Sequence, residues 1–156
     1  GVERAERDIM KQKPRKSSSS IFSGGLGINI IYQGIIEGLL TLGAYYIAKA
    51  LYSSEVAVTV AFLTLGLIQL THAFNVRSDR KSVFQIGLFS NMYLIGATAI
   101  SVVLQVIVIV IPGLNDIFRV VQLSASQWLL VLAFSLVIIP IVEAVKLFQR
   151  SFKTSK

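Results

Sequence analysis

The stretch that decides the fold is LTLGLIQLTHAFNVRSDRK, residues 63–81. It begins with residues that suit a lipid bilayer and ends in a short segment with three basic side chains. An apolar run that leads into lysine and arginine is typical of a transmembrane helix reaching the cytoplasmic face. The stretch also carries Gln69, His72 and Asn75 before its charges begin, so polar groups enter the predicted span.

The composition of the whole chain supports a membrane protein. Hydrophobic residues make up 54% of the 156 positions, charged residues only 15%, and the mean hydropathy is +0.71. A soluble domain is usually less apolar and carries roughly 25% charged residues. Apolar stretches recur four times, each near the ~20 residues that a helix needs to cross a bilayer. We therefore predict an all-α polytopic membrane protein with four transmembrane helices, at about residues 26–51, 56–75, 92–114 and 128–147.

Basic residues predict how these spans are oriented. Thirteen of the fifteen lysines and arginines lie in the arm before the first span, the loop after the second, or the C-terminal segment. By the positive-inside rule, both termini and the middle loop are cytoplasmic. We assign residues 1–20 to a cytoplasmic loop and residues 21–156 to the membrane domain. The basic residues are split over three membrane-flanking segments without interleaved aromatics, so we expect no nucleic acid partner.

The sequence offers few groups for catalysis. It has no cysteine, a single histidine and no glycine-rich phosphate loop, and its acidic residues are not paired at ligand spacing. We therefore predict no catalytic residue and no cofactor-binding residue in this chain.

The first predicted span contains a packing motif around an ionisable residue. Gly34-Ile-Ile-Glu-Gly38 is a GxxxG motif, which lets a neighbouring helix approach closely. Glu37 lies between the two glycines, where an ionised carboxylate costs about 2–3 kcal/mol unless it is neutral or paired. Two interpretations stay open for Glu37. It is either a proton or cation site, or a protonated side chain hydrogen-bonded to another helix.

Three residues of the second span, two of them polar, recur at every third position. Gly66, Gln69 and His72 are spaced three residues apart, so they lie near one helix face, which we expect to turn toward protein. His72 is interpreted as a neutral interhelical hydrogen-bonding residue, with metal ligation as the less favoured alternative. In the last span, Glu143 and Lys146 predict an ion pair that snorkels to the inner interface.

Three separated motifs carry a resemblance to a known family. The arm GVERAERDIMKQKPR resembles the loop between the sixth and seventh membrane helices of type II P-type cation ATPases. HAFNVRSDRKSVFQIGLFSN and SASQWLLVLAFSLVIIPIVEAVKLF look like that family's loop between helices eight and nine and its tenth helix, in the form of bacterial calcium pumps. The resemblance covers essentially the whole chain, with the motifs in the family's order.

This resemblance implies that the chain is a fragment of an ATP-driven pump for cations, with calcium the expected ion. The chain starts at Gly1 without an initiator methionine, and the family's phosphorylated aspartate, nucleotide-binding domain and actuator domain are expected upstream. The fragment alone would not be an enzyme and would hold no cofactor, whereas the parent would use ATP and magnesium and transport calcium. The fragment would supply helices seven to ten as a scaffold in the bacterial plasma membrane. Its partners would be the bilayer, helices one to six and the cytoplasmic domains.

The resemblance also assigns roles to particular residues. Alignment of the family's Ala-Leu-Asn segment with Ala73-Phe74-Asn75 places Gln69 where the eighth helix of related pumps provides a carboxylate to a calcium site. An amide has no charge, and calcium sites depend on carboxylates. We therefore expect one transported calcium per cycle. In the N-terminal loop, Glu3, Glu6 and Asp8 are candidates for contact with the phosphorylation domain.

Two alternatives from other functional classes stay open. A self-contained four-helix exporter could couple proton entry to small-molecule exit through Glu37. Its drawback is the long basic arm, since small exporters start nearly at the first helix. An assembly subunit could instead use the face of Gly34 and Gly38 to bind a separate ATPase core.

Overall fold

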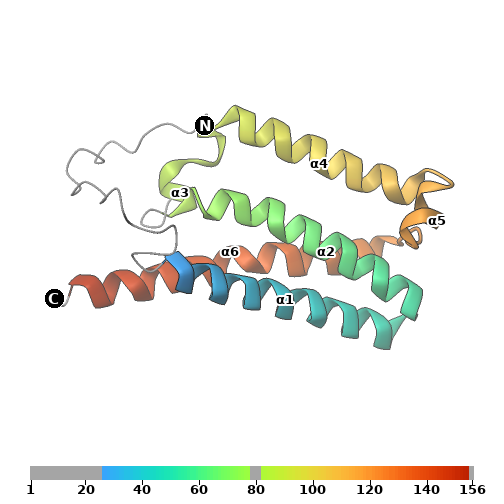
Figure 1. The fold of residues 1–156 in the computed structure, drawn as a ribbon, viewed down its shortest axis with the longest axis horizontal. Helices are drawn as coiled ribbons and strands as arrows, with labels where there is room; N and C mark the ends of the chain where they lie inside the picture. Colours follow the sequence, from blue (N-terminus) through green and yellow to red (C-terminus); the bar gives the residue numbers. More distant parts are fainter. Residues whose placement is uncertain (1–25, 78–81, 155–156) are drawn as a thin grey trace.

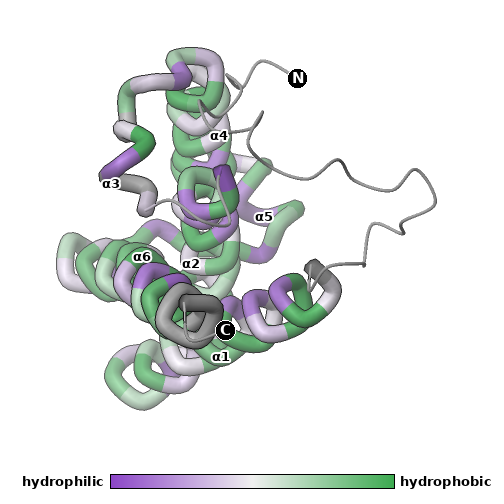
Figure 2. Tube along the Cα trace, turned by 90° about the vertical axis from the view of Figure 1, so that its left-hand side faces the viewer, coloured by the Kyte–Doolittle hydropathy of each residue, from purple (hydrophilic) through white to green (hydrophobic). Residues whose placement is uncertain are grey.

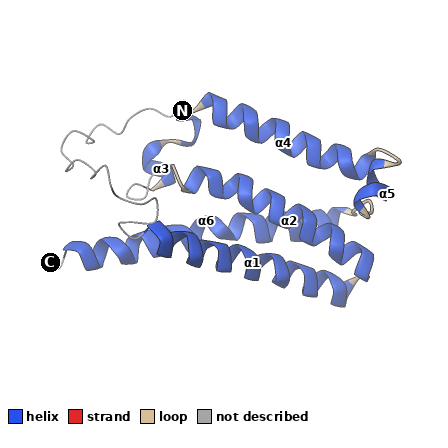
Figure 3. Cartoon of the chain, viewed as in Figure 1, coloured by secondary structure: helices blue, strands red, loops and turns tan. Residues whose placement is uncertain are grey.

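The computed structural model describes residues 26–77 and 82–154, and within these ranges every regular element is helical (Figure 3). The long helices are α1 (Leu26–Leu51), α2 (Ser54–Asn75), α4 (Met92–Val110) and α6 (Ala125–Thr154). Three short helical segments lie in the connections: α3 (Val83–Ile86), η3 (Leu88–Ser90) and α5 (Leu114–Phe118).

Helices α1 and α2 form a tight antiparallel hairpin. Only Tyr52 and Ser53 separate them, and the Ser53 hydroxyl accepts a hydrogen bond from the backbone N–H of Val56 at 3.3 Å. Serine is a favoured N-cap because its oxygen satisfies an amide that has no partner within the helix. Small side chains let the two backbones approach closely. The fully buried ones are Ala44, Ala48 and Ala57.

Helix α2 is the centre of the assembly. It packs extensively against both α1 and α6, and α4 lies along its opposite side (Figures 1 and 2). The α4 helix makes at most sparse contact with α1 and α6. The main core cluster joins α2 to residues of the other long helices and includes Val60, Leu63, Ile109 and Val131. A second cluster lies nearer the end of α2 and contains Ile68, Ile138 and Val142.

The connection from α4 to α6 begins earlier than the sequence predicted. Helix α4 ends at Val110 rather than near residue 114, because Pro112 cannot continue the helix and Gly113 takes a φ of 90°. The returning chain is held to α2, since the backbone N–H of Val121 donates to the buried Thr59 hydroxyl at 2.8 Å.

Most of the apolar surface is not buried within the described chain. Apolar residues occur along all the long helices (Figure 2), and many of their large side chains are exposed, such as Ile35, Val103 and Leu129. All four long helices have the length and hydropathy needed to cross a membrane: Gly27–Leu51, Ser54–Asn75, Met92–Val110 and Ala125–Phe148. These findings confirm the prediction of an all-α polytopic membrane protein with four membrane-spanning helices.

Candidate intramembrane polar site

Two ionisable residues that the sequence singled out separately meet between α1 and α2. His72 Nε2 lies 3.8 Å from Glu37 Oε1, and their side chains are 12% and 17% exposed. This distance is too long for a direct hydrogen bond but allows an ion pair when the imidazole is protonated and the carboxylate is ionised. The other imidazole nitrogen, Nδ1, is buried and has no hydrogen-bond partner among the described residues.

A lysine from α6 joins the same end of α2. Lys146 is only 5% exposed, and its Nζ donates a hydrogen bond to the backbone carbonyl of Asn75 at 2.7 Å. The last carbonyls of a helix lack partners within the helix, so an ammonium group there satisfies an acceptor and complements the helix dipole. Lys146 Nζ also lies 3.8 Å from Glu143 Oε1. The predicted pair thus forms, and Lys146 is buried against the end of α2.

The three residues predicted to share one face of α2, Gly66, Gln69 and His72, have three different surroundings. Gly66 lies against α4, where a Cβ would overlap the terminal amide nitrogen of Gln105 and lie 2.9 Å from its Cδ. His72 faces α1 through Glu37. Gln69 is exposed, and its side chain has no hydrogen bond to the described residues. The expectation that the shared face turns toward protein therefore does not hold for Gln69 within the described chain.

The GxxxG motif of α1 is also not covered by another helix within the described residues. A Cβ at Gly34 or Gly38 would meet no atom within 4 Å in the described structure. Neighbouring residues of the same helix are exposed apolar side chains, including Ile31 and Ile35. Both glycines therefore leave a shallow, open strip on α1 beside Glu37.

Other predictions receive no test from the geometry. Glu3, Glu6 and Asp8 lie outside the described residues. Within residues 26–77 and 82–154, no group of three or more histidine, cysteine or acidic side chains could hold a metal ion. Neither the Glu37–His72 pair nor Gln69 belongs to such a group in this part of the chain.

Sequence reasoning missed two residues of this region. Asn75, to which the sequence assigns no role, is 1% exposed, and neither its Oδ1 nor its Nδ2 has a hydrogen-bond partner in the described structure. Gln105 of α4 packs its side-chain amide onto Gly66 of α2. A polar residue two positions before the first basic residue of a loop was a usable signal for Asn75. Nothing in the sequence indicated the contact between Gln105 and Gly66, because this contact depends on how α2 and α4 face each other.

Comparisons with known proteins identify the family. Residues 1–148 match the family described as Cation transporting ATPase, C-terminus. The chain is 36% identical to calcium-transporting ATPase 1 of Bacillus cereus over 168 aligned residues, which cover 97% of this chain and 19% of the relative. It is 38% identical to the calcium-transporting ATPase of Bacillus subtilis over 137 residues, with 86% and 15% covered. A calcium-transporting ATPase of Listeria monocytogenes is 35% identical over 153 residues, with 97% and 17% covered.

The match spans less than one fifth of the length of these relatives. The bacterial relatives and the four apolar helices together indicate an integral protein of the plasma membrane. The family match extends over nearly the whole chain and includes all four of these helices. The chain therefore belongs to the family of cation-transporting ATPases, and what it represents is the C-terminal membrane region of that family.

Proposed function

We propose that the chain forms helices seven to ten of an ATP-driven calcium efflux pump and acts as a scaffold beside the helices that carry the ion. The relatives named calcium-transporting ATPases support calcium as the ion. The pump as a whole would use ATP and magnesium, with calcium as its cargo. Catalysis would belong to the cytoplasmic domains, and this chain would contribute packing surfaces and one candidate ion-facing position.

The observation that carries this proposal is an uncovered face at one depth of the bundle. Gly34 lies about one helical turn before Glu37, Gly38 directly follows Glu37, and Gln69 lies about one turn before His72. Since α1 and α2 are antiparallel and Glu37 and His72 approach to 3.8 Å, Gly38 and the exposed amide of Gln69 lie at about the same depth, whereas Gly34 lies about one turn from the pair in the other direction. A face with room for a closely packed helix and a polar group beside it suits the transport helices of a pump.

Gln69 would face those helices without supplying a charge. Its carbonyl oxygen can coordinate calcium, but a neutral amide is a weaker ligand than the carboxylate that related pumps place there. We therefore infer that the pump moves one calcium per cycle. The self-contained exporter is the weaker candidate, because a chain of the cation-transporting ATPase family is built to pack against an ATPase core.

A chimera tests the proposal. This chain replaces the matched C-terminal region of the Bacillus cereus ATPase, and ATP-driven uptake of radioactive calcium is measured in inverted membrane vesicles. The expected result is uptake by the chimera and none by this chain alone or by the truncated relative alone. A chimera that inserts and forms its phosphoenzyme from ATP, yet transports no calcium, would contradict the proposal. Calcium uptake by this chain alone would contradict the scaffold role.

A further inference from the structure

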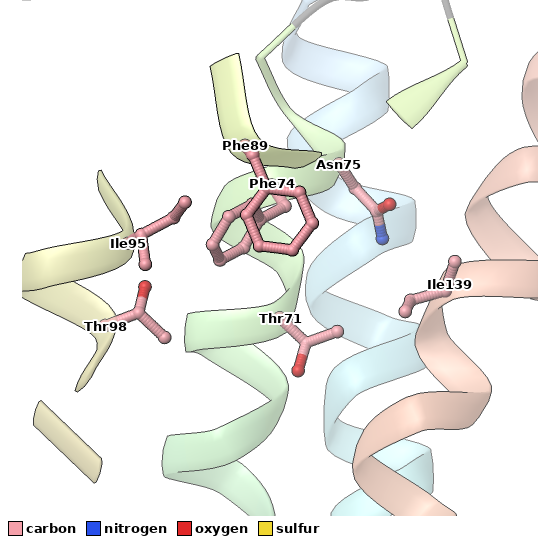
Figure 4. A pocket seen from close by; sticks show the side chains of 7 residues that line it. All are labelled: Thr71, Phe74, Asn75, Phe89, Ile95, Thr98 and Ile139. Atoms are coloured by element: carbon pink, nitrogen blue, oxygen red, sulfur yellow. The ribbon is translucent and has the colours of Figure 1, made fainter. Parts of the chain in front are cut away.

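A partly open groove lies between α4 and α6, on the side of α2 away from the Gln69 face. Its volume is about 320 Å³, within the range of small-molecule sites. The walls are almost wholly apolar and include Phe74 of α2, Ile95 of α4 and Ile139 of α6 (Figure 4). Phe89 lies at the rim and is 78% exposed. The groove exists because α4 packs along α2 and makes at most sparse contact with α6.

One polar side chain in this apolar groove lacks partners. Asn75 lines the groove, and its amide points to the side of the groove formed by Ile139 (Figure 4). The residue is 1% exposed, and neither Oδ1 nor Nδ2 forms a hydrogen bond within the described structure. Buried amides in native proteins almost always have partners, so this one indicates a missing ligand. The ligand must offer both an acceptor for Nδ2 and a donor for Oδ1.

The position of the groove in the bundle narrows the chemistry of that ligand. Asn75 is the last residue of α2, so its amide lies near the end of the hydrocarbon layer, while Thr71 lines the groove one turn deeper. Two cationic residues lie near this end, although neither lines the groove: Lys146 donates to the carbonyl of Asn75, and Arg77 donates to the Gly87 carbonyl and the Ser90 hydroxyl. The apolar walls deeper in the groove suit an acyl chain. The amide at the end of the hydrocarbon layer suits a glycerol ester, and the nearby cations suit a phosphate.

The size of the groove argues against a protein helix as the occupant. A transmembrane helix is about 10 Å across and about 30 Å long, far more than a groove of about 320 Å³ can receive. A single acyl chain is thin enough. We propose that this groove binds one glycerophospholipid, with an acyl chain between Ile95 and Ile139 and an ester carbonyl accepting from Asn75 Nδ2. A head group with its own O–H or N–H donor, such as phosphatidylglycerol, can also satisfy Oδ1, whereas phosphatidylcholine cannot.

Native mass spectrometry of the full chain in mild detergent tests this assignment. Dioleoyl phosphatidylglycerol and dioleoyl phosphatidylcholine are titrated onto the delipidated chain, and the bound fraction is read from the mass of each complex. We expect one tight site for phosphatidylglycerol, about fivefold tighter than for phosphatidylcholine, which is the effect of one hydrogen bond. Oleic acid is the third probe, because binding as tight as that of phosphatidylglycerol would show that the site needs only a chain with a polar end and would overturn the phospholipid assignment.

Two variants and a control locate the site. Asn75→Ala removes the amide, and we expect this variant to bind phosphatidylglycerol and phosphatidylcholine with about equal affinity. Thr98→Trp fills the groove from α4 without touching Asn75, and we expect it to abolish the tight site even if Asn75→Ala proves too unstable to assay. Gln122→Ala, an exposed polar residue in the loop before α6, should leave binding unchanged.

Photoactivatable phosphatidylglycerol provides an independent readout, since its label should fall on peptides that contain Phe74 or Ile139. Unchanged affinity in both Asn75→Ala and Thr98→Trp, or labelling confined to other helices, would overturn the proposal. Because these measurements need neither ATP nor calcium, they are separate from the test of pump function.

Discussion

Replacing Lys146 by methionine tests the contact that ties α6 to the end of α2. Methionine keeps the length of the side chain but removes the ammonium group, which donates to the Asn75 carbonyl at 2.7 Å in a position only 5% exposed. A hydrogen bond that involves a charged group contributes about 1.5–3 kcal/mol, and its loss here also leaves a buried carbonyl and the Glu143 carboxylate without this partner. We expect Lys146→Met to lower the free energy of unfolding by about 2–3 kcal/mol.

The assay is reversible unfolding in dodecyl maltoside micelles titrated with sodium dodecyl sulfate. Trp128 is the only tryptophan and packs against the main core cluster, so its fluorescence reports the loss of α6 packing. Lys49→Met is the matched control, because Lys49 is exposed on α1 and its Nζ lies 5.8 Å from the centroid of the Tyr45 ring, so its removal should change stability by less than about 1 kcal/mol. A change of less than about 0.5 kcal/mol in Lys146→Met would refute the reasoning, since the contact would then contribute nothing measurable.

Three further predictions concern the α1–α2 face. In the calcium-transporting chimera, Gln69→Glu should raise the calcium-to-ATP ratio above one, whereas a wild-type ratio of two would contradict the role assigned to the amide. Gly38→Leu should leave the unfolding free energy of this chain within about 0.5 kcal/mol of wild type, since no atom lies within 4 Å of a Cβ at this position. The same substitution should abolish calcium uptake by the chimera, and normal uptake would show that no helix packs against Gly38. Glu37→Gln should change stability by less than about 1 kcal/mol, because the 3.8 Å separation from His72 is too long for a hydrogen bond, and double-mutant cycles with His72→Phe measure this coupling.

The polar residues of the site were visible in the sequence because their surroundings are so apolar. Glu37 and His72 stand out within predicted spans, where ionisable groups are costly. Their meeting at 3.8 Å was not predictable, since it depends on the register between two antiparallel helices. A slip of one residue would turn either side chain by about 100° around its helix axis. The same dependence on register hid the contact between Lys146 and the end of α2.

The sequence by itself determined that this protein is helical and crosses the membrane four times, and its motifs pointed to the family of cation-transporting ATPases. The physical reason is that a bilayer demands internally bonded backbone and about 20 apolar residues per helix, both of which can be recognised along the chain. Only the tertiary structure decided which faces meet. Hydrophobic burial does not select faces among helices that are apolar all round, so small residues and polar contacts select them. That selection placed α2 at the centre, left Gln69 and the glycines of α1 uncovered, and opened the groove at Asn75.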